Sequence, residues 1–190
     1  MTQDADVEKM KITLKNYGYE YIQPIGYGAF SSVHLCQSIK YTHQFAVKKV
    51  AKNKLSPNEY DALISLDHPN IIKLYITFED DESQYLVMEY CPNGSFHDKG
   101  DLSPEKFTYY AKQLLEALAI CHSKNIAHRD IKPDNIFLDQ YDHPKLADFG
   151  LARHFDSNQT SVEKCGTLMY CAPEILKQQQ QICPFKADIW

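Results

Sequence analysis

Two short motifs in the second half of the chain carry side chains that could do chemistry. Residues 128–135 are His-Arg-Asp-Ile-Lys-Pro-Asp-Asn, and Asp-Phe-Gly follows at 148–150. Asp130 offers a carboxylate that can take a proton from a hydroxyl, and Asn135 and Asp148 offer oxygen ligands for Mg²⁺. Transfer of a phosphoryl group from ATP needs these groups and little covalent chemistry from the protein. The alternative for the first motif is an ordinary charged turn, with Arg129 and Asp130 as a surface pair and Pro133 as a helix breaker, but eight positions and a second motif agree with the chemical interpretation.

The elements that must position these motifs change in kind along the chain. In the first 90 residues, runs rich in β-branched and aromatic residues alternate with turn residues, which predicts strands. Residues 1–16 are polar and charged, and we expect a loose leader there. The predicted elements are strands at 19–25, 33–35, 45–50, 71–78 and 85–90, with a short helix at 57–66.

A longer helix is predicted directly before the first motif, after a linker at about 89–94. Ser103 can cap its start, and Pro104 suits the first helical position. Short strands are expected at 136–138 and 145–147. The apolar residues that recur at helical spacing are Phe107, Ala111, Leu114, Leu115, Leu118 and Cys121.

Composition and charge limit the class of protein. The 190 residues are 44% hydrophobic and 24% charged, which fits one globular domain or two small lobes. The formal net charge of −5 argues against a nucleic-acid partner. The start of the chain lacks the apolar core of a signal peptide, and the longest apolar stretch, near 114–121, is too short to span a bilayer. We therefore expect a cytoplasmic protein without a membrane span, and its oligomeric state stays open.

A glycine-rich turn follows the first predicted strand. Residues 26–33 are Gly-Tyr-Gly-Ala-Phe-Ser-Ser-Val, and glycines allow backbone N–H groups to approach phosphates closely. Alone, this segment could be an ordinary hairpin turn. It lacks the Gly-Lys-Ser/Thr of a P-loop, and the strand that follows it argues against a dinucleotide fingerprint.

Taken in order, these motifs resemble those of eukaryotic-type protein kinases. The resemblance runs from Gly26 to Trp190 and includes Ala-Val-Lys at 46–48, Gly-Thr at 166–167 and Ala-Pro-Glu at 172–174. It implies an α+β, protein-kinase-like two-lobe fold, with a strand-rich N-lobe at about 17–90 and a mainly helical C-lobe at about 95–190. ATP would bind between the lobes. The chain stops at what resembles the start of the central C-lobe helix, so we expect an incomplete C-lobe.

The resemblance implies a serine/threonine kinase that uses ATP and Mg²⁺ and phosphorylates protein substrates. Asp130 would orient the acceptor hydroxyl and accept its proton, and Lys132 would neutralise the transferring phosphoryl group. Asn135 and Asp148 would hold Mg²⁺. Lys132, two residues after the base, resembles the serine/threonine branch rather than the tyrosine branch.

Lys48 would contact the α- and β-phosphates of the nucleotide. Its neighbour Lys49 must point to the opposite face, because side chains alternate along a strand. The alternative is that both are surface lysines on an edge strand. The other nucleotide-binding positions that the resemblance implies are Ile25, Gly26, Gly28, Val33, Ala46, Met88, Glu89, Cys91 and Phe137.

Glu59 has two competing roles. It could pair with Lys48 as a catalytic residue, as the resemblance implies. It could instead close a capping box with Ser56 at the start of the short helix. Lys48 and Glu59 are eleven residues apart, fewer than we expect for the family, and both roles stay open.

Residues 151–170 would form the activation loop. Where many relatives carry a phosphorylated threonine, this chain has Glu163. Its carboxylate could replace the phosphate by pairing with Arg129, or it could be an exposed loop residue. Thr160 and Ser161 stay candidate phosphorylation sites.

The resemblance also implies supporting contacts. His128 and Phe149 would stack with Leu63 and Leu74 in a hydrophobic spine. Asp188 would brace the segment 128–135, which corresponds to the catalytic loop of the family.

Two other functions compete with protein phosphorylation. A non-catalytic kinase-like module, binding nucleotide or a partner, would fit the short helix and the incomplete C-lobe. Such a module would usually lack the lysine, the base or a metal ligand, and this chain has all of them. A small-molecule kinase is disfavoured by the elements at 166–167 and 172–174, which resemble those that seat peptide substrates.

Overall fold

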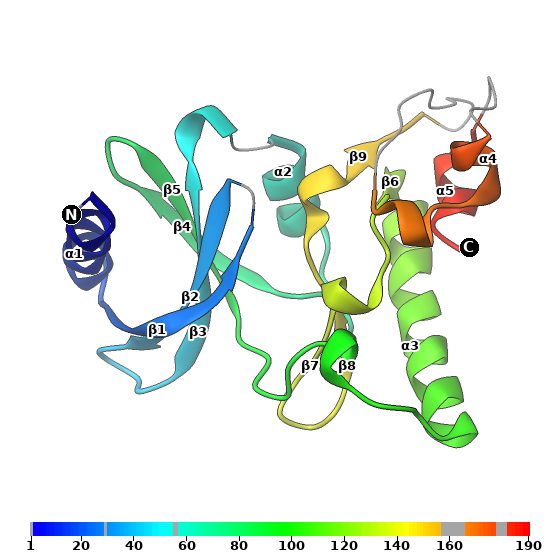
Figure 1. The fold of residues 1–190 in the computed structure, drawn as a ribbon, viewed down its shortest axis with the longest axis horizontal. Coiled ribbons are helices and arrows are strands. Elements are labelled where there is room, and N and C mark those ends of the chain that lie inside the picture. The colour runs from blue at the N-terminus through cyan, green and yellow to red at the C-terminus, as the bar shows by residue number, and fades with distance from the viewer. Residues whose placement is uncertain (1, 29, 55–56, 157–165, 178–181) are drawn as a thin grey trace. The chain divides into compact units, whose positions relative to one another are not determined.

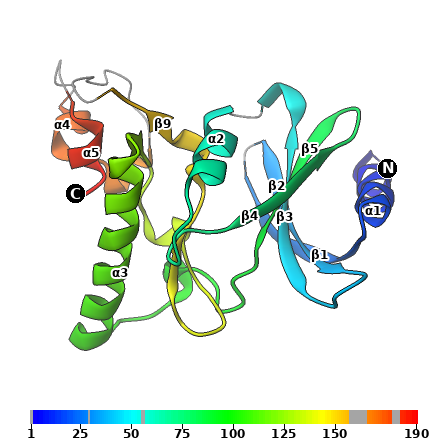
Figure 2. The same ribbon diagram turned by 180° about the vertical axis from the view of Figure 1, so that it is seen from behind.

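The computed structural model describes the chain except for residues 1, 29, 55–56, 157–165 and 178–181. It divides into two compact units, which we call the sheet unit (within residues 1–55 and 73–90) and the helical unit (within 56–72 and 91–190). Figures 1 and 2 show the strands β1 to β5 in the former and the long helix α3 in the latter. Residues 57–72 are part of the predicted N-lobe, and their contacts assign them to the helical unit.

The sheet unit contains a five-stranded antiparallel sheet with strand order β1-β2-β3-β5-β4. All five predicted strands form. The last but one begins at Leu74 rather than at residue 71, because Ile71 and Ile72 pair with Leu146 of the helical unit, to which they belong. The strands are β1 (Tyr19–Tyr27), β2 (Ser31–Ser38), β3 (Gln44–Ala51), β4 (Leu74–Glu79) and β5 (Ser83–Glu89), and the 3₁₀ helix η1 (Lys52–Lys54) follows β3.

The register gives the two faces of this sheet different residues. Side chains alternate along a strand, and direct partners in antiparallel strands share a face. Val33, Lys48 and Leu86 are successive partners across β2, β3 and β5, and they define the Lys48 face. Lys49 and its partner Tyr85 lie on the opposite side, which we call the Lys49 face.

Residues 2–16 form the helix α1 (Thr2–Asn16), so the expectation of a loose leader is wrong. Met10 and Leu14 are only 2% and 0% exposed. With Val7 they recur at i, i+3 and i+7, the spacing of one helical face, and that face packs on the sheet (Figure 1). The buried cluster consists of Met10, Leu14, Cys36, Val47, Phe78, Tyr85 and Val87.

The longest helix of the helical unit is α3 (Pro104–Ser123). Its predicted start is confirmed, because Ser103 Oγ accepts a hydrogen bond from Lys106 N at 3.3 Å. The unit also contains the helices α2 (Pro57–Ser65), α4 (Pro173–Leu176) and α5 (Pro184–Ala187), the 3₁₀ helices η2 (Phe96–Asp98), η3 (Pro133–Asn135), η4 (Phe149–Leu151) and η5 (Leu168–Tyr170), and the strands β6 (Ile126–Ala127), β7 (Ile136–Leu138), β8 (Pro144–Leu146) and β9 (Arg153–His154).

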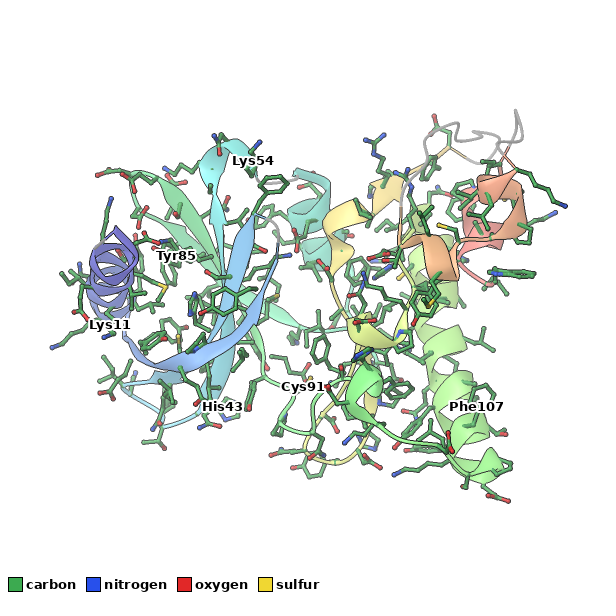
Figure 3. The ribbon with its side chains drawn as sticks, in the orientation of Figure 1. Lys11, His43, Lys54, Tyr85, Cys91 and Phe107 are labelled. Carbon is green, nitrogen blue, oxygen red and sulfur yellow. The ribbon has the colours of Figure 1, made fainter. Side chains whose placement is uncertain are left out.

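The predicted apolar face of α3 is wrong in part. Phe107, labelled in Figure 3, and Leu115 are 62% and 52% exposed. Helix α3 has apolar residues on two sides, and spacing alone did not identify the buried side. Its buried residues are Tyr110, Ala117, Leu118 and Cys121.

Two small antiparallel sheets hold the segments that carry the chemical motifs. Strand β6 pairs with β9, and β7 pairs with β8. The segment 128–135 therefore runs between β6 and β7, and Asp-Phe-Gly at 148–150 lies between β8 and β9. The four short strands fix both ends of each segment.

Candidate active site

Asp188 holds the backbone at the start of the catalytic loop, residues 128–135. Its Oδ2 accepts a hydrogen bond from His128 N at 2.8 Å, and its Oδ1 accepts one from Arg129 N at 2.7 Å. Arg129 has a φ of 71°, a left-handed conformation that costs a non-glycine residue about 1–2 kcal/mol. The predicted brace is confirmed, and it holds Arg129 in this conformation.

His128 connects the catalytic loop to the segment before Asp148. Its Nδ1 accepts a hydrogen bond from Asp130 N at 3.3 Å, so the neutral ring carries its proton on Nε2, which donates to Ala147 O at 2.9 Å. The ring is fully buried, and burial lowers the pKa of His128. It meets the ring of Phe149 at a steep angle, with centroids 4.7 Å apart, which confirms the predicted contact between these two residues.

Asp130 lies at the centre of a hydrogen-bonded cluster. Its Oδ2 is 2.8 Å from Lys132 Nζ. Its Oδ1 accepts hydrogen bonds from Thr167 N and Thr167 Oγ1, each at 2.9 Å. Lys132 Nζ also donates to Thr167 Oγ1 at 2.8 Å. A hydroxyl is thus held between the carboxylate and the lysine that the sequence predicts to be catalytic.

The surroundings of Asp130 keep its carboxylate ionised. Burial raises the pKa of Asp130, but the hydrogen bonds from Lys132 and Thr167 and the charge of Lys132 outweigh it, and the net pKa lies below its ordinary value. The side chain is 10% exposed. At neutral pH the group is therefore an acceptor for hydroxyl protons and a weak base.

Asn135 is oriented by Asp130. Its Nδ2 donates to Asp130 O at 2.8 Å and to Asp130 Oδ2 at 3.0 Å. The residue is 5% exposed. Because the amide nitrogen is used in this way, Oδ1 is the atom of Asn135 whose chemistry suits a cation.

Asp148 has a left-handed backbone, with φ 59° and ψ 69°, at the start of η4. The next residue, Phe149, is fully buried and anchors the segment. A Cβ on Gly150 would lie 3.3 Å from Asp148 Oδ1 and 3.7 Å from Glu59 Oε2. Glu59, 5% exposed, therefore packs beside the Asp-Phe-Gly segment, within the helical unit.

Gly166 is required at its position. Its φ is +91°, and a Cβ would lie 2.6 Å from Arg129 O. No side chain fits at that distance from a backbone oxygen. The close approach of Gly166 to the catalytic loop brings Thr167 to Asp130.

A cavity of about 350 Å³ opens beside the Asp130 cluster, within the helical unit. Leu168 and Met169, next to Thr167, are 74% and 82% exposed. Burial raises the pKa of the Cys171 thiol, another cavity residue, and the charge of Asp130 adds to this. The lining includes Asp130, Lys132, Thr167, Met169, Tyr170 and Cys171.

The predicted nucleotide-binding residues of the sheet unit lie mostly on one face. Gly26 pairs with Val33, Val33 with Lys48, and Ala46 with Met88, which places all five on the Lys48 face. This register was not evident from the sequence.

The ends of the glycine-rich turn are also described. Gly28 N donates to Ser31 O at 2.8 Å and closes it, and a Cβ at Gly28 would lie 2.8 Å from Ser31 Oγ. Ile25 lies in the irregular part of β1 and is 40% exposed.

The remaining predicted nucleotide-binding residues are divided between the two units. Glu89, at the end of β5, belongs to the sheet unit, and Cys91 (8% exposed) and Phe137 (on β7) belong to the helical unit. The pairing of Lys48 with Glu59 stays a prediction, as do the spine contacts of Leu63 and Leu74. Ser56, Thr160, Ser161 and Glu163 lie outside the described residues.

Two residues of this site were missing from the predicted set of catalytic positions. Thr167 was identified only as part of a Gly-Thr element, yet its hydroxyl contacts both Asp130 and Lys132. His122, in the last turn of α3, lies with Nε2 2.9 Å from Asp188 Oδ2. No sequence signal pointed to His122, because its partner is 66 residues away.

Two features are absent from the residues that the structure describes. In that part of the chain no group of three or more His, Cys, Asp or Glu side chains is arranged to hold a metal ion. A Mg²⁺ site here would therefore rest on Asn135, Asp148 and the phosphates themselves, a sparse ligand set typical of this ion. None of the described helices is long and apolar enough to cross a membrane.

Comparison with known proteins gives a consistent set of relatives. The protein kinase domain matches residues 19–190. The chain is 37% identical to 3-phosphoinositide-dependent protein kinase B of Dictyostelium discoideum, over 90% of the chain and 21% of that protein. It is 34% identical to serine/threonine-protein kinase cds1 of Schizosaccharomyces pombe (97% and 45%) and 40% identical to calcium-dependent protein kinase 6 of Plasmodium berghei (87% and 12%). The chain spans less than half the length of each of these relatives.

Proposed function

Because the chain belongs to the protein kinase family, we propose that it transfers the γ-phosphoryl group of ATP to serine and threonine hydroxyls of protein substrates. One observation carries the proposal. The Thr167 hydroxyl lies 2.9 Å from Asp130 Oδ1 and 2.8 Å from Lys132 Nζ. The two groups thus bind an aliphatic hydroxyl of the kind that a serine or threonine substrate presents.

Each residue of the cluster has a distinct role in this reaction. Asp130 accepts a hydrogen bond from the acceptor hydroxyl and finally takes its proton. Its lowered pKa makes it a better orienting group than base, which suits phosphoryl transfer, where little covalent help is needed. Lys132 neutralises negative charge beside the acceptor oxygen. Thr167 and Asn135 hold the Asp130 carboxylate in place.

Protein kinases use ATP together with Mg²⁺. ATP supplies the phosphoryl group, and Mg²⁺ neutralises the charge of the phosphates. The residues of this chain fit that pair of ligands. Asn135 is fixed with its amide nitrogen on Asp130, and Asp148 adds a carboxylate. On the sheet unit, Lys48 and the closed glycine turn would take the phosphates.

The reaction can be tested with peptides that differ only in the acceptor residue. We expect transfer of labelled γ-phosphate to the serine and threonine peptides and not to the tyrosine peptide. Asp130→Asn should lower kcat by about 10²–10⁴-fold, the usual contribution of a positioned base, while the Kd for Mg-ADP stays unchanged. Asp81→Asn, an exposed change in the β4–β5 turn, is the matched control.

Two results would contradict the proposal. One is a chain that binds Mg-ADP but phosphorylates none of the peptides under any condition, which would favour the non-catalytic module. The other is an Asp130→Asn variant as active as the control. No described feature now favours the non-catalytic alternative, since Lys48, Asp130, Asn135 and Asp148 are all present.

A further inference from the structure

Helix α1 is built into the hydrophobic core of the sheet unit. Met10 and Leu14 share one buried cluster with side chains of four strands, from Cys36 on β2 to Val87 on β5. In Figure 3 the labelled Tyr85 lies on the side of the sheet toward α1. This ring is 0% exposed, so α1 and the Lys49 face form one continuous core.

Helix α1 contacts β3 at the two residues that flank Lys48 in the sequence. Val47, before Lys48, is 1% exposed and belongs to the buried cluster that contains Met10 and Leu14. Lys49, after Lys48, has its Nζ 2.7 Å from Asp6 Oδ1. The Lys49 side chain is only 14% exposed, although a lysine on an outer strand face is usually solvated. Since side chains alternate, holding Val47 and Lys49 on one face directs Lys48 to the other.

Polar contacts fix the far end of α1 to the β4–β5 turn. Asp80 Oδ2 accepts hydrogen bonds from Tyr85 OH at 2.8 Å and from Thr13 Oγ1 at 3.4 Å. The ring of Tyr17, just after α1, stacks on Phe78 with centroids 4.1 Å apart. These contacts set the direction of the helix as well as its depth, so the position of Asp6 over β3 is determined.

We propose that α1 is a positioning element for the nucleotide lysine. Asp6 and Lys49 are positioning residues, which act through Lys48 and touch no substrate. Their ion pair and the packing of Val47 limit the motion of β3, and this fixes where the Lys48 amine can lie. An error of about 1 Å in placing such a group can lower the rate about 10²-fold. The inference rests on the proposed function, because it needs Lys48 to bind nucleotide.

The test is a double-mutant cycle between α1 and Lys48, read as the Kd for Mg-ADP. Asp6→Asn and Lys49→Met should each weaken binding about two- to fivefold, the range available to a partly exposed ion pair. The exchanged pair, Asp6→Lys with Lys49→Asp, should restore most of the affinity. In a Lys48→Met background, Asp6→Asn should have no further effect.

The helix offers its own control. Ile12 lies on the same helix and is 63% exposed, so Ile12→Asn should change neither the Kd nor the melting temperature. Asp6 is 61% exposed, so Asp6→Asn will fold, and its melting temperature reports any general loss of stability.

The outcomes separate the inference from the proposed function. If the unaltered chain does not bind Mg-ADP, the proposed function fails, and the inference falls with it. If the chain binds and Asp6→Asn binds equally well, only the inference is overturned. It is also overturned if Asp6→Asn weakens binding by the same factor with and without Lys48, because the effect then does not pass through that lysine.

Discussion

Removing the Asp188 carboxylate should destabilise the helical unit and release the catalytic loop. The carboxylate is 1% exposed and accepts hydrogen bonds from the backbone of His128 and Arg129. A buried donor left without a partner costs about 1–3 kcal/mol, so the two donors left in Asp188→Ala give about 2–6 kcal/mol. Asp188→Asn keeps one acceptor oxygen and should lose about half as much. The whole free energy of unfolding of a domain is about 5–15 kcal/mol, so this loss is a large part of it.

Urea unfolding, followed by circular dichroism, measures this loss. The urea midpoint should be highest for the unaltered chain, lower for Asp188→Asn and lowest for Asp188→Ala. The free energy of unfolding of Asp81→Asn should lie within about 0.5 kcal/mol of that of the unaltered chain. Hydrogen exchange at the amides of His128 and Arg129 should accelerate in the same order. The reasoning is wrong if Asp188→Ala unfolds at the same urea concentration as the control and keeps both amides protected.

Three further predictions concern residues around Asp130. Gly166→Ala places a Cβ 2.6 Å from Arg129 O at a φ of +91°, and should lower stability by at least the 1–2 kcal/mol of the left-handed backbone; an unchanged melting temperature would contradict this. Thr167→Val removes the hydroxyl that donates to Asp130 and should lower kcat at least tenfold, whereas Thr167→Ser keeps a hydroxyl and should retain most of the kcat. Equal kcat values for Thr167→Val and Thr167→Ser would show that the hydroxyl is not used. Burial lowers the pKa of His128, so the unfolded chain takes up a proton below about pH 6.5 before the folded chain does. The stability from neutral His128 is complete above pH 6.5 and is lost as pH falls through the lower folded value, by at most about 1.4 kcal/mol per pH unit. Urea unfolding from pH 7.5 to 5 should show a shallower loss for His128→Phe, and parallel profiles would refute the assignment.

The sequence predicted the parts of the site that lie close together along the chain. Asp130, Lys132 and Asn135 fall within six residues, so their spacing carried the information, and the structure places them in contact. Thr167 and His122 were not predicted as members because their contacts span 35 to 66 residues. Contacts of that length depend on the whole fold rather than on a local pattern.

The sequence was less informative about α1 and α3. The overall polarity of residues 1–16 predicts a loose leader, although Val7, Met10 and Leu14 have helical spacing. A narrow apolar stripe on a charged helix still packs when a partner surface exists. Helix α3 has apolar residues on two sides, and this pattern does not indicate which side is buried.

The imidazole of His128 acts as a spacer of fixed length within the helical unit. One nitrogen accepts from Asp130 N and the other donates to Ala147 O, immediately before Asp148. The two ring nitrogens are separated by covalent bonds, so thermal motion can tilt this link but cannot stretch it. The backbone that carries Asp130 and the backbone that leads to Asp148 are therefore kept at one separation, which a flexible side chain such as glutamine would not maintain.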